Sequence, residues 1–354
     1  MDELYYDAID MLKDMISISS FSREEADVAD MIEHRLSLFG LLPHRHGNNI
    51  WCIAQPFDSE KPTVLLNSHI DTVKPAQGWT RHPFTPTDED GRIYGLGSND
   101  AGASVVSLTA AFRHLCTIER AYNLILLLSC EEEVSGRNGI ESVLPLLPHI
   151  DVAIVGEPTG MHPAIAEKGL MVLDGEITGL SGHAARNEGI NAIYRAIEVV
   201  DVLRNLTFEK VSSMLGPVKI TVSQIEAGTQ HNVVPDRCKI VVDIRTTDAY
   251  TNEQTLALVR NAVPHEWCTL TPRSTRLNPS GISENHPLVN RLVTLGRNTF
   301  GSPTLSDQAL MPFPSLKLGP GESARSHSAD EFIFTEEIRS AIQIYITLLT
   351  GLTL

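Results

Sequence analysis

Residues 64–71 read Val64-Leu-Leu-Asn-Ser-His69-Ile-Asp71, so an apolar run ends in two polar side chains. Such a run, with β-branched residues and preceded by Pro62, is typical of a strand buried on both faces of a sheet. Residues two apart on an extended chain point the same way, so His69 and Asp71 should emerge together at the carboxyl end of this strand. A carboxylate beside an imidazole fixes the tautomer and suits a metal-ligating histidine, although a hydrogen-bonded pair closing a turn would give the same pattern.

Further acidic side chains follow other apolar runs in the same half of the chain. The run Glu131–Glu133 comes directly after one predicted strand, and Glu157 follows the next. Strands that alternate with helices imply a mostly parallel sheet, where ligands bind beyond the carboxyl ends of the strands. A run of three glutamates is most often a solvated surface, but its position after a buried strand favours a site shared with His69.

Hydrophobic periodicity and turn signals define the expected elements along the whole chain. Ser22 and Glu25 form a capping-box pattern that should open a helix ending at Gly40. Further helices are expected at 1–16, 100–116, 138–147, 189–206, 252–263, 287–300 and 335–349. Strands are expected at 50–54, 63–68, 123–130, 151–155, 170–178, 218–225, 239–246 and 266–271.

The character of the chain changes near Leu170, where the expected order becomes β-α-β-β-α-β, a ferredoxin-like pattern. The helix at 189–206 has one apolar face, made up of Ile190, Ile193, Ile197 and Val200. We place this inserted α+β domain at 174–278. Residues 1–173 and 279–354 should form an α/β catalytic domain with a mostly parallel mixed sheet and helices on both faces.

Length, charge and cysteine usage exclude several classes of function. A chain of 354 residues is expected to form two domains, and 44 acidic against 28 basic residues give a net charge of −16. That charge disfavours nucleic acid and anionic membranes as partners, and no apolar run approaches the ~18 residues of a membrane span. The acidic N-terminus is unlike a signal peptide. Five scattered cysteines without Cys-X-X-Cys spacing indicate neither a disulfide framework nor a thiolate zinc site, so the cytoplasm fits best.

Three carboxylates, those of Asp100, Glu133 and Glu157, and two imidazoles, those of His69 and His327, suit a pair of divalent metals. If Asp100 bridges, His69 and Glu157 can complete one metal, and Glu133 with His327 the other. Two zinc ions, three carboxylates and a bound hydroxide sum to a neutral core, which lowers the cost of burying it. Ligands without thiolate suit a catalytic zinc pair but also admit cobalt or manganese.

Glu132 lies beside a candidate ligand and is free to act as the general base that moves a proton from water to a leaving amine. A non-catalytic amino-acid binding protein would keep the ligands and lose this base, so the presence of Glu132 argues against it. A two-metal phosphatase would need Arg or Lys near the ligands to hold phosphate, and these motifs contain none. The sequence therefore favours an amidohydrolase.

The chain resembles the family of acetylornithine deacetylases, succinyl-diaminopimelate desuccinylases, aminoacylases and carboxypeptidase G over nearly its whole length. The motifs that carry this resemblance are His69-Ile-Asp71, Gly95-Leu-Gly-Ser-Asn-Asp100, Glu131-Glu-Glu-Val-Ser-Gly136, Gly156-Glu-Pro-Thr159, Ser181-Gly-His183-Ala-Ala-Arg186, His231-Asn-Val-Val-Pro-Asp236 and Gly319-Pro-Gly321 with His327. The family's usual Asp-Met-Lys-Gly is replaced here by Asp100-Ala-Gly-Ala103, a departure that leaves the subfamily open.

The resemblance implies two zinc ions per chain, with Co²⁺ or Mn²⁺ as alternatives. The implied metal ligands are His69, Asp100, Glu133, Glu157 and His327. It further implies that Glu132 is the general base and that Asp71 orients His69. The inserted domain becomes a lid that also forms a homodimer, with His183, Asn232 and Arg245 reaching toward substrate.

The implied reaction is hydrolysis of the amide bond of a small N-acyl amino acid. Acetylornithine or N-succinylornithine deacylation in arginine biosynthesis is the first hypothesis. Succinyl-diaminopimelate desuccinylase or a metallo-dipeptidase or carboxypeptidase of the same fold is the alternative. The sequence does not distinguish these substrates, because acyl group and amino acid depend on the shape of the pocket.

Overall fold

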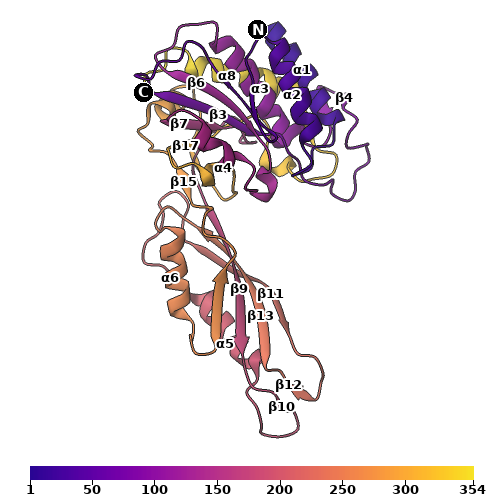
Figure 1. Ribbon diagram of the computed structural model, residues 1–354, viewed down its shortest axis with the longest axis vertical. Helices are drawn as coiled ribbons and strands as arrows, with labels where there is room; N and C mark the ends of the chain where they lie inside the picture. Colours follow the sequence, from indigo (N-terminus) through magenta and orange to yellow (C-terminus); the bar gives the residue numbers. More distant parts are fainter. The chain divides into compact units, whose positions relative to one another are not determined.

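The computed structural model describes residues 1–354, and the chain divides into two compact units (Figure 1). The larger unit contains residues 1–165, 281–300 and 306–354, and the smaller unit contains residues 166–280 and 301–305. None of the helices has the combination of length and apolar composition that crossing a membrane requires.

The larger unit is built of a central sheet with flanking helices. Its helices are α1 (Asp2–Ser17), α2 (Ala26–Leu38), α3 (Ala103–Leu115), α4 (Ile140–Val143), α7 (Pro287–Thr294) and α8 (Thr335–Leu349). Its strands are β1 (His44–His46), β2 (Asn49–Ile53), β3 (Thr63–His69), β4 (Thr87–Glu89), β5 (Arg92–Tyr94), β6 (Asn123–Ser129), β7 (Val152–Val155), β17 (Ser315–Lys317) and β18 (Phe332–Phe334). Near the sequence boundaries between the units lie β8 (Ala164–Glu167), β15 (Ser280–Gly281) and β16 (Phe300–Ser302).

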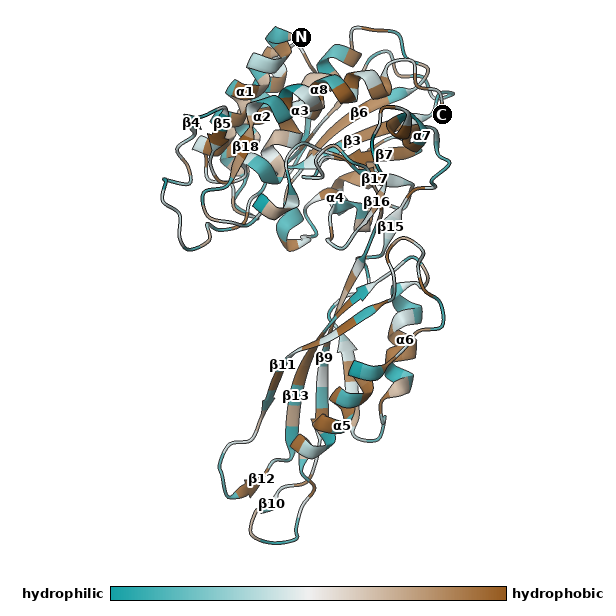
Figure 2. Ribbon diagram, turned by 180° about the vertical axis from the view of Figure 1, so that it is seen from behind, coloured by the Kyte–Doolittle hydropathy of each residue, from teal (hydrophilic) through white to brown (hydrophobic).

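The core of the central sheet is parallel, as the alternation of strands and helices predicts. Strands β6, β3, β7 and β17 are neighbours in that order and all run parallel, while β2 pairs antiparallel with β6. Every residue of β3, β6 and β7 is buried, which explains their continuous apolar sequences (Figure 2). The carboxyl ends of these strands therefore meet at one edge of the sheet.

Helices cover both faces of this sheet. On one face, Ile140 and Val143 of α4 share a buried cluster with Leu65 of β3 and Ile125 of β6. On the other, α3 approaches so closely that a Cβ at Gly156 would lie 2.8 Å from the side chain of Ser104. The small residues of α3 thus permit the close packing that buries the strands.

The smaller unit has the element order β-α-β-β-α-β of a ferredoxin-like domain. Its elements are β9 (Gly169–Thr178), α5 (Ala192–Asn205), β11 (Lys219–Ala227), β13 (Arg237–Thr246), α6 (Asn252–Ala262) and β14 (Cys268–Pro272), with β10 (Gly182–His183) and β12 (Val233–Val234) as an added short pair. The sheet order is β11-β13-β9-β14 and all its pairs are antiparallel. Residues of α5 and α6 share one apolar cluster with the sheet.

Helix α5 packs through a different face from the one its isoleucines define. Its buried residues are Ala192, Ala196, Val199 and Leu203. Ile197 is 59% exposed and Ile190, just before the helix, is 42% exposed. Small alanine side chains let the helix axis approach the sheet, so the larger isoleucines are left on the outer side.

Three predicted helices are shorter than the sequence pattern suggests. Only Ile140–Val143 is α-helical in the segment 138–147, because Pro145 lacks the N–H needed to continue the helix. Helix α7 ends at Thr294, ahead of Gly296 with φ of 77°, and β16 follows. Helix α3 begins at Ala103 after an irregular π-type turn, Ser98–Gly102.

The capping box predicted at Ser22 and Glu25 is wrong. Helix α2 begins at Ala26 without a side-chain cap. The Ser22 hydroxyl instead donates to Asp71 Oδ2 at 2.7 Å, and Glu25 accepts the backbone N–H of Arg23 and of Glu131. These two side chains satisfy the loops at the strand ends rather than the first turn of the helix.

Candidate metal centre

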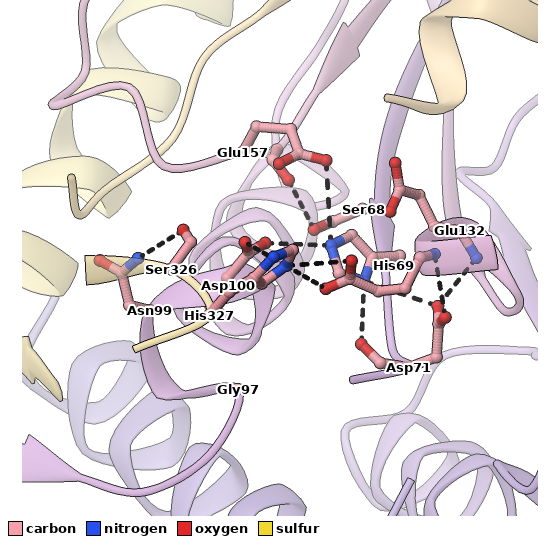
Figure 3. Close-up of polar contacts among 12 residues, drawn as sticks. Ser68, His69, Asp71, Gly97, Asn99, Asp100, Glu132, Glu157, Ser326 and His327 are labelled. Atoms are coloured by element: carbon pink, nitrogen blue, oxygen red, sulfur yellow. Dashed lines mark hydrogen bonds and ion pairs between the residues drawn. The ribbon is translucent and has the colours of Figure 1, made fainter. Parts of the chain in front are cut away.

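Six predicted site residues meet at the carboxyl edge of the parallel sheet, and Figure 3 labels all of them except Glu133. His69 is the last residue of β3, and Glu132 and Glu133 lie in the 3-10 turn after β6. Glu157 follows β7, Asp100 lies in the turn before α3, and His327 follows the 3-10 turn Ser323–Arg325. The end of β3 and four separate loops therefore bring these side chains to one place.

Asp100 lies between the two histidines. Its Oδ1 is 3.2 Å from His69 Nε2, and its Oδ2 is 3.7 Å from His327 Nε2. Glu157 Oε1 is 3.8 Å from His69 Nε2, and Glu133 Oε1 is 3.1 Å from His327 Nε2. The five side chains thus form two groups that share one carboxylate, an arrangement that fits a bridged pair of cations.

Glu132 is next to a candidate ligand in the sequence, and in the structure its carboxylate also lies among these groups. Its carboxylate, with side-chain atoms of His69 and Glu157, forms one set of potential ligands within 4.8 Å of one another. A second such set is His69, Asp100 and Glu133. Burial raises the pKa of Glu132 well above its usual value, although the charge of His69 opposes this. A carboxylate with a raised pKa is suited to accepting and releasing a proton.

The pKa shifts at this site result from burial and from the close approach of several carboxylates. Burial and the nearby charge of Asp100 raise the pKa of Glu157 to about 8. The hydrogen bond to Glu133 raises the pKa of His327 to about 9, and burial opposes this. Burial alone would lower the pKa of His69, but the hydrogen bond to Asp100 and the nearby carboxylates raise it well above its usual value. Because cations would stabilise all of these carboxylates at once, the donor set fits divalent metals with oxygen and nitrogen ligands.

Asp71 holds the glutamate turn as well as the histidine. The nearer acceptor for His69 Nδ1 is the backbone carbonyl of Asp71 at 3.0 Å, with its carboxylate at 3.5 Å. The carboxylate accepts the backbone N–H of Glu132 at 3.0 Å and of Glu133 at 3.1 Å. An N–H on Nδ1 leaves His69 Nε2 free for a metal, so Asp71 fixes both sides of the site.

Sequence reasoning missed three other buried carboxylates around the site. Glu25 accepts the backbone N–H of Glu131, and Glu331 accepts three backbone N–H groups of the loop that carries Asp100. Asp307 accepts the Ser129 hydroxyl at 2.6 Å, and burial raises the pKa of Asp307 to about 6. Spacing along the chain carries no signal for such contacts between loops, because the partners lie far apart in the sequence.

The other three predicted residues lie in the smaller unit. His183 is exposed in β10, and its Nδ1 accepts the N–H of Ala185 at 3.1 Å. Asn232 is also exposed and lies next to this turn, since its carbonyl accepts the N–H of Ala184. Arg245 lies near the carboxyl end of β13 and forms a two-point ion pair with Asp243. The structure brings His183 and Asn232 together but not Arg245.

This fold, with a cluster of candidate metal ligands at the sheet edge, points to the class of metal-dependent hydrolases. The sequence matches peptidase family M20/M25/M40 over residues 65–351, and the chain belongs to that family.

Curated relatives include two kinds of deacylase. The acetylornithine deacetylase of Pectobacterium atrosepticum is 31% identical over 305 residues, which cover 79% of this chain and 77% of the relative. The succinyl-diaminopimelate desuccinylase of Buchnera aphidicola is 27% identical over 280 residues, 73% of each chain. The sequence is thus similar to relatives of both names.

Solved structures agree with this chain in fold. The aminopeptidase PepT of Bacillus cereus has a TM-score of 0.80 at 16% identity, covering 98% of each chain. The YXEP protein of Bacillus subtilis, described as a dinuclear metal-binding peptidase of the M20 family, has a TM-score of 0.76 at 16% identity and covers 99% of this chain and 100% of its own. The predicted α/β fold is therefore confirmed.

Proposed function

We propose that this chain is a deacylase that hydrolyses the amide bond of a small N-acyl amino acid, N-acetylornithine or N-succinylornithine, in arginine biosynthesis. The observation that carries the proposal is Asp100 between His69 and His327, with Glu132 beside them. The names of the curated relatives favour acyl amino acids over longer peptides. The five free cysteines, four of them buried, suit the reducing cytoplasm.

Two divalent cations, zinc or else Co²⁺ or Mn²⁺, would occupy this site. His69, Glu157 and Asp100 would hold one of them, and Asp100, Glu133 and His327 would hold the other. When bound, these ions would supply Lewis-acid activation of the amide carbonyl and of a water molecule.

Glu132 is proposed to take the proton from that water and to pass it to the departing amine. Its raised pKa fits both steps, because the proton must be held briefly and then released. Asp71 keeps the carboxylate of Glu132 in place by binding the backbone N–H of the same residue. Glu133, one residue along, is held by the other oxygen of Asp71 and serves as a metal ligand.

We further propose a homodimer through the smaller unit, in which His183 serves the site of the partner subunit. Four large apolar side chains near α5 are exposed, namely Leu180, Ile190, Tyr194 and Ile197. A monomer gains nothing from exposing such a patch, whereas a two-fold interface would bury it.

A distance within the smaller unit supports the proposal that His183 acts at the site of the partner subunit. Arg245 pairs with Leu170 at one end of β13, and Arg237 pairs with Thr178 at the other, close in sequence to His183. Eight residues of strand at about 3.3 Å each separate these ends by roughly 25 Å. A small acyl amino acid cannot touch both Arg245 and His183 of one chain. His183 Nδ1 accepts a hydrogen bond, so Nε2–H can donate to the oxyanion of a substrate.

The test is hydrolysis by metal-loaded protein of acetyl, succinyl and formyl derivatives of ornithine, citrulline and diaminopimelate, with dipeptides beside them. Highest kcat/KM on an acyl-ornithine would support the proposal. Highest kcat/KM on succinyl-diaminopimelate would establish the desuccinylase that the second relative names. Cleavage of dipeptides alone would replace deacylation with peptidase activity, and a wild-type protein that binds no metal would rule out the whole class.

A further inference from the structure

Glu331 is a buried carboxylate that contacts the loop of Asp100 rather than any predicted ligand side chain. It is 2% exposed. Its Oε1 accepts the backbone N–H of Asn99 and of Asp100, both at 2.9 Å, and its Oε2 accepts that of Gly97 at 3.0 Å. Its own carbonyl accepts the N–H of Gly95 at 3.0 Å. Glu331 therefore holds the whole turn that ends at Asp100.

The same turn is tied back to the loop that carries His327. The Asn99 side-chain amide donates to the carbonyl of Glu322 at 3.1 Å and to the Ser326 hydroxyl at 3.2 Å. Its oxygen accepts the N–H of Glu322 at 3.0 Å. Asn99 is completely buried, so these bonds have no competition from water. The loops of Asp100 and His327 thus form one hydrogen-bonded unit.

Asp100 needs such support because its backbone is irregular. Its φ of −121° and ψ of 97° are not helical, so the turn before α3 cannot satisfy its own N–H groups in the usual way. Glu331 supplies the missing acceptors. Since the direction of the Asp100 carboxylate follows from its backbone, these bonds determine whether Oδ1 and Oδ2 face His69 and His327 together.

We propose that Glu331 is a positioning residue for the metal pair, which fixes Asp100 so that its carboxylate can bridge two cations. The inference rests on the proposed metal site but not on the substrate. It predicts that loss of Glu331 weakens metal binding itself, before any turnover. A residue that served only the stability of the fold would leave the metal affinity of the folded protein unchanged.

The neighbouring residue offers a matched control. Asp330 also accepts three hydrogen bonds, from the N–H and hydroxyl of Thr80 and from the N–H of Arg81. That loop carries no predicted ligand. Asp330 has a positive φ of 54°, which asparagine tolerates, so Asp330→Asn disturbs an equal number of hydrogen bonds, at a more exposed place, with little backbone strain.

The experiment measures Zn²⁺ and Co²⁺ affinity of the full-length chain by competition with a chromophoric chelator, without substrate. Glu331→Ala should bind metal about 10- to 100-fold more weakly than wild type, with an altered visible spectrum of the Co²⁺ form. Glu331→Gln should lie between, because one amide oxygen can still accept two of the three N–H groups. Asp330→Asn should bind metal as wild type does. Melting of the metal-free variants checks the fold.

Distinct outcomes separate this inference from the proposed function. A wild-type chain that binds no metal contradicts the proposed function. Wild-type affinity in both Glu331 variants, or an equal loss in Asp330→Asn, overturns the positioning role while the deacylase proposal stands. If Glu331→Ala does not fold, Glu331→Gln decides, and failure of both to fold would make Glu331 a residue of the fold alone.

Discussion

Replacing Asp71 with asparagine tests whether one carboxylate organises the glutamate turn. Asp71 is 1% exposed, and each of its oxygens accepts a backbone N–H, from Glu132 on Oδ1 and from Glu133 on Oδ2. Burial would raise the pKa of Asp71, but the hydrogen bond and charge of His69 lower it, so the group is ionised. An asparagine has one oxygen and one NH₂, so in either orientation its NH₂ faces a backbone N–H.

The geometry sets the size of the effect. At least one buried N–H loses its acceptor in Asp71→Asn, which costs about 1–3 kcal/mol of unfolding free energy. The same loss lets Glu132 or Glu133 move, and displacement of residues that support metal ligands typically lowers activity by about 10- to 100-fold. Ser22→Ala is the matched control, because it removes the hydroxyl donated to Asp71 and leaves both N–H bonds intact. It should cost about 1 kcal/mol and leave kcat unchanged.

For both variants we would measure denaturant unfolding of the metal-loaded protein and its metal content. We would also measure kcat and KM on the preferred acyl amino acid. The expected result is a stability loss in both but a loss of kcat in Asp71→Asn alone. If Asp71→Asn matches Ser22→Ala in stability and in kcat, the carboxylate does not position the glutamate turn, and the reasoning from its hydrogen bonds is refuted.

Three further predictions concern the site and its symmetry. Glu132→Ala should keep both metals yet lose roughly 10² to 10⁴ in kcat, whereas Glu133→Ala should lose metal, and the reverse metal contents would exchange these roles. In metal-free protein the pKa values of Glu157, about 8, and His327, about 9, exceed the ordinary values of 4.5 and 6.5 for these side chains. The folded state therefore binds more protons, and the Tm of chelated protein should fall between pH 6 and pH 9.5, while an unchanged Tm would contradict these shifts. Mixing His183→Ala with Glu132→Ala should restore about a quarter of wild-type activity through heterodimers, and tagged heterodimers without activity would exclude His183 from the partner's site.

The sequence predicts the groups at the sheet edge because each follows a strand whose apolar run is unmistakable. His69 is the last residue of β3, Glu133 and Glu157 come after β6 and β7, and parallel strands must place their carboxyl ends together. No knowledge of loop conformation is needed for that step. Asp100 and His327 lie outside these strand ends, so strand order does not predict their position, and the family resemblance supplies the support for them.

Contacts between loops could not be predicted from the sequence, and the reason is physical. Ser22 and Glu25 fit a capping box, but the same hydroxyl and carboxylate can satisfy any backbone or side-chain group that the fold brings near. Only tertiary structure decides, and here Asp71 and Glu131 compete successfully with the helix. Similarly, α5 has apolar residues on more than one side, and close packing of its alanines rather than the isoleucine spacing selects the buried face.

The acidic excess of this chain is partly structural. Glu25, Asp71 and Glu331 are each at most 2% exposed, and each accepts backbone N–H groups from a loop at the sheet edge. Irregular loops cannot be buried unless such N–H groups find acceptors, so these carboxylates make burial of the site possible. These hydrogen bonds hold the backbone that carries Glu132, Glu133 and Asp100.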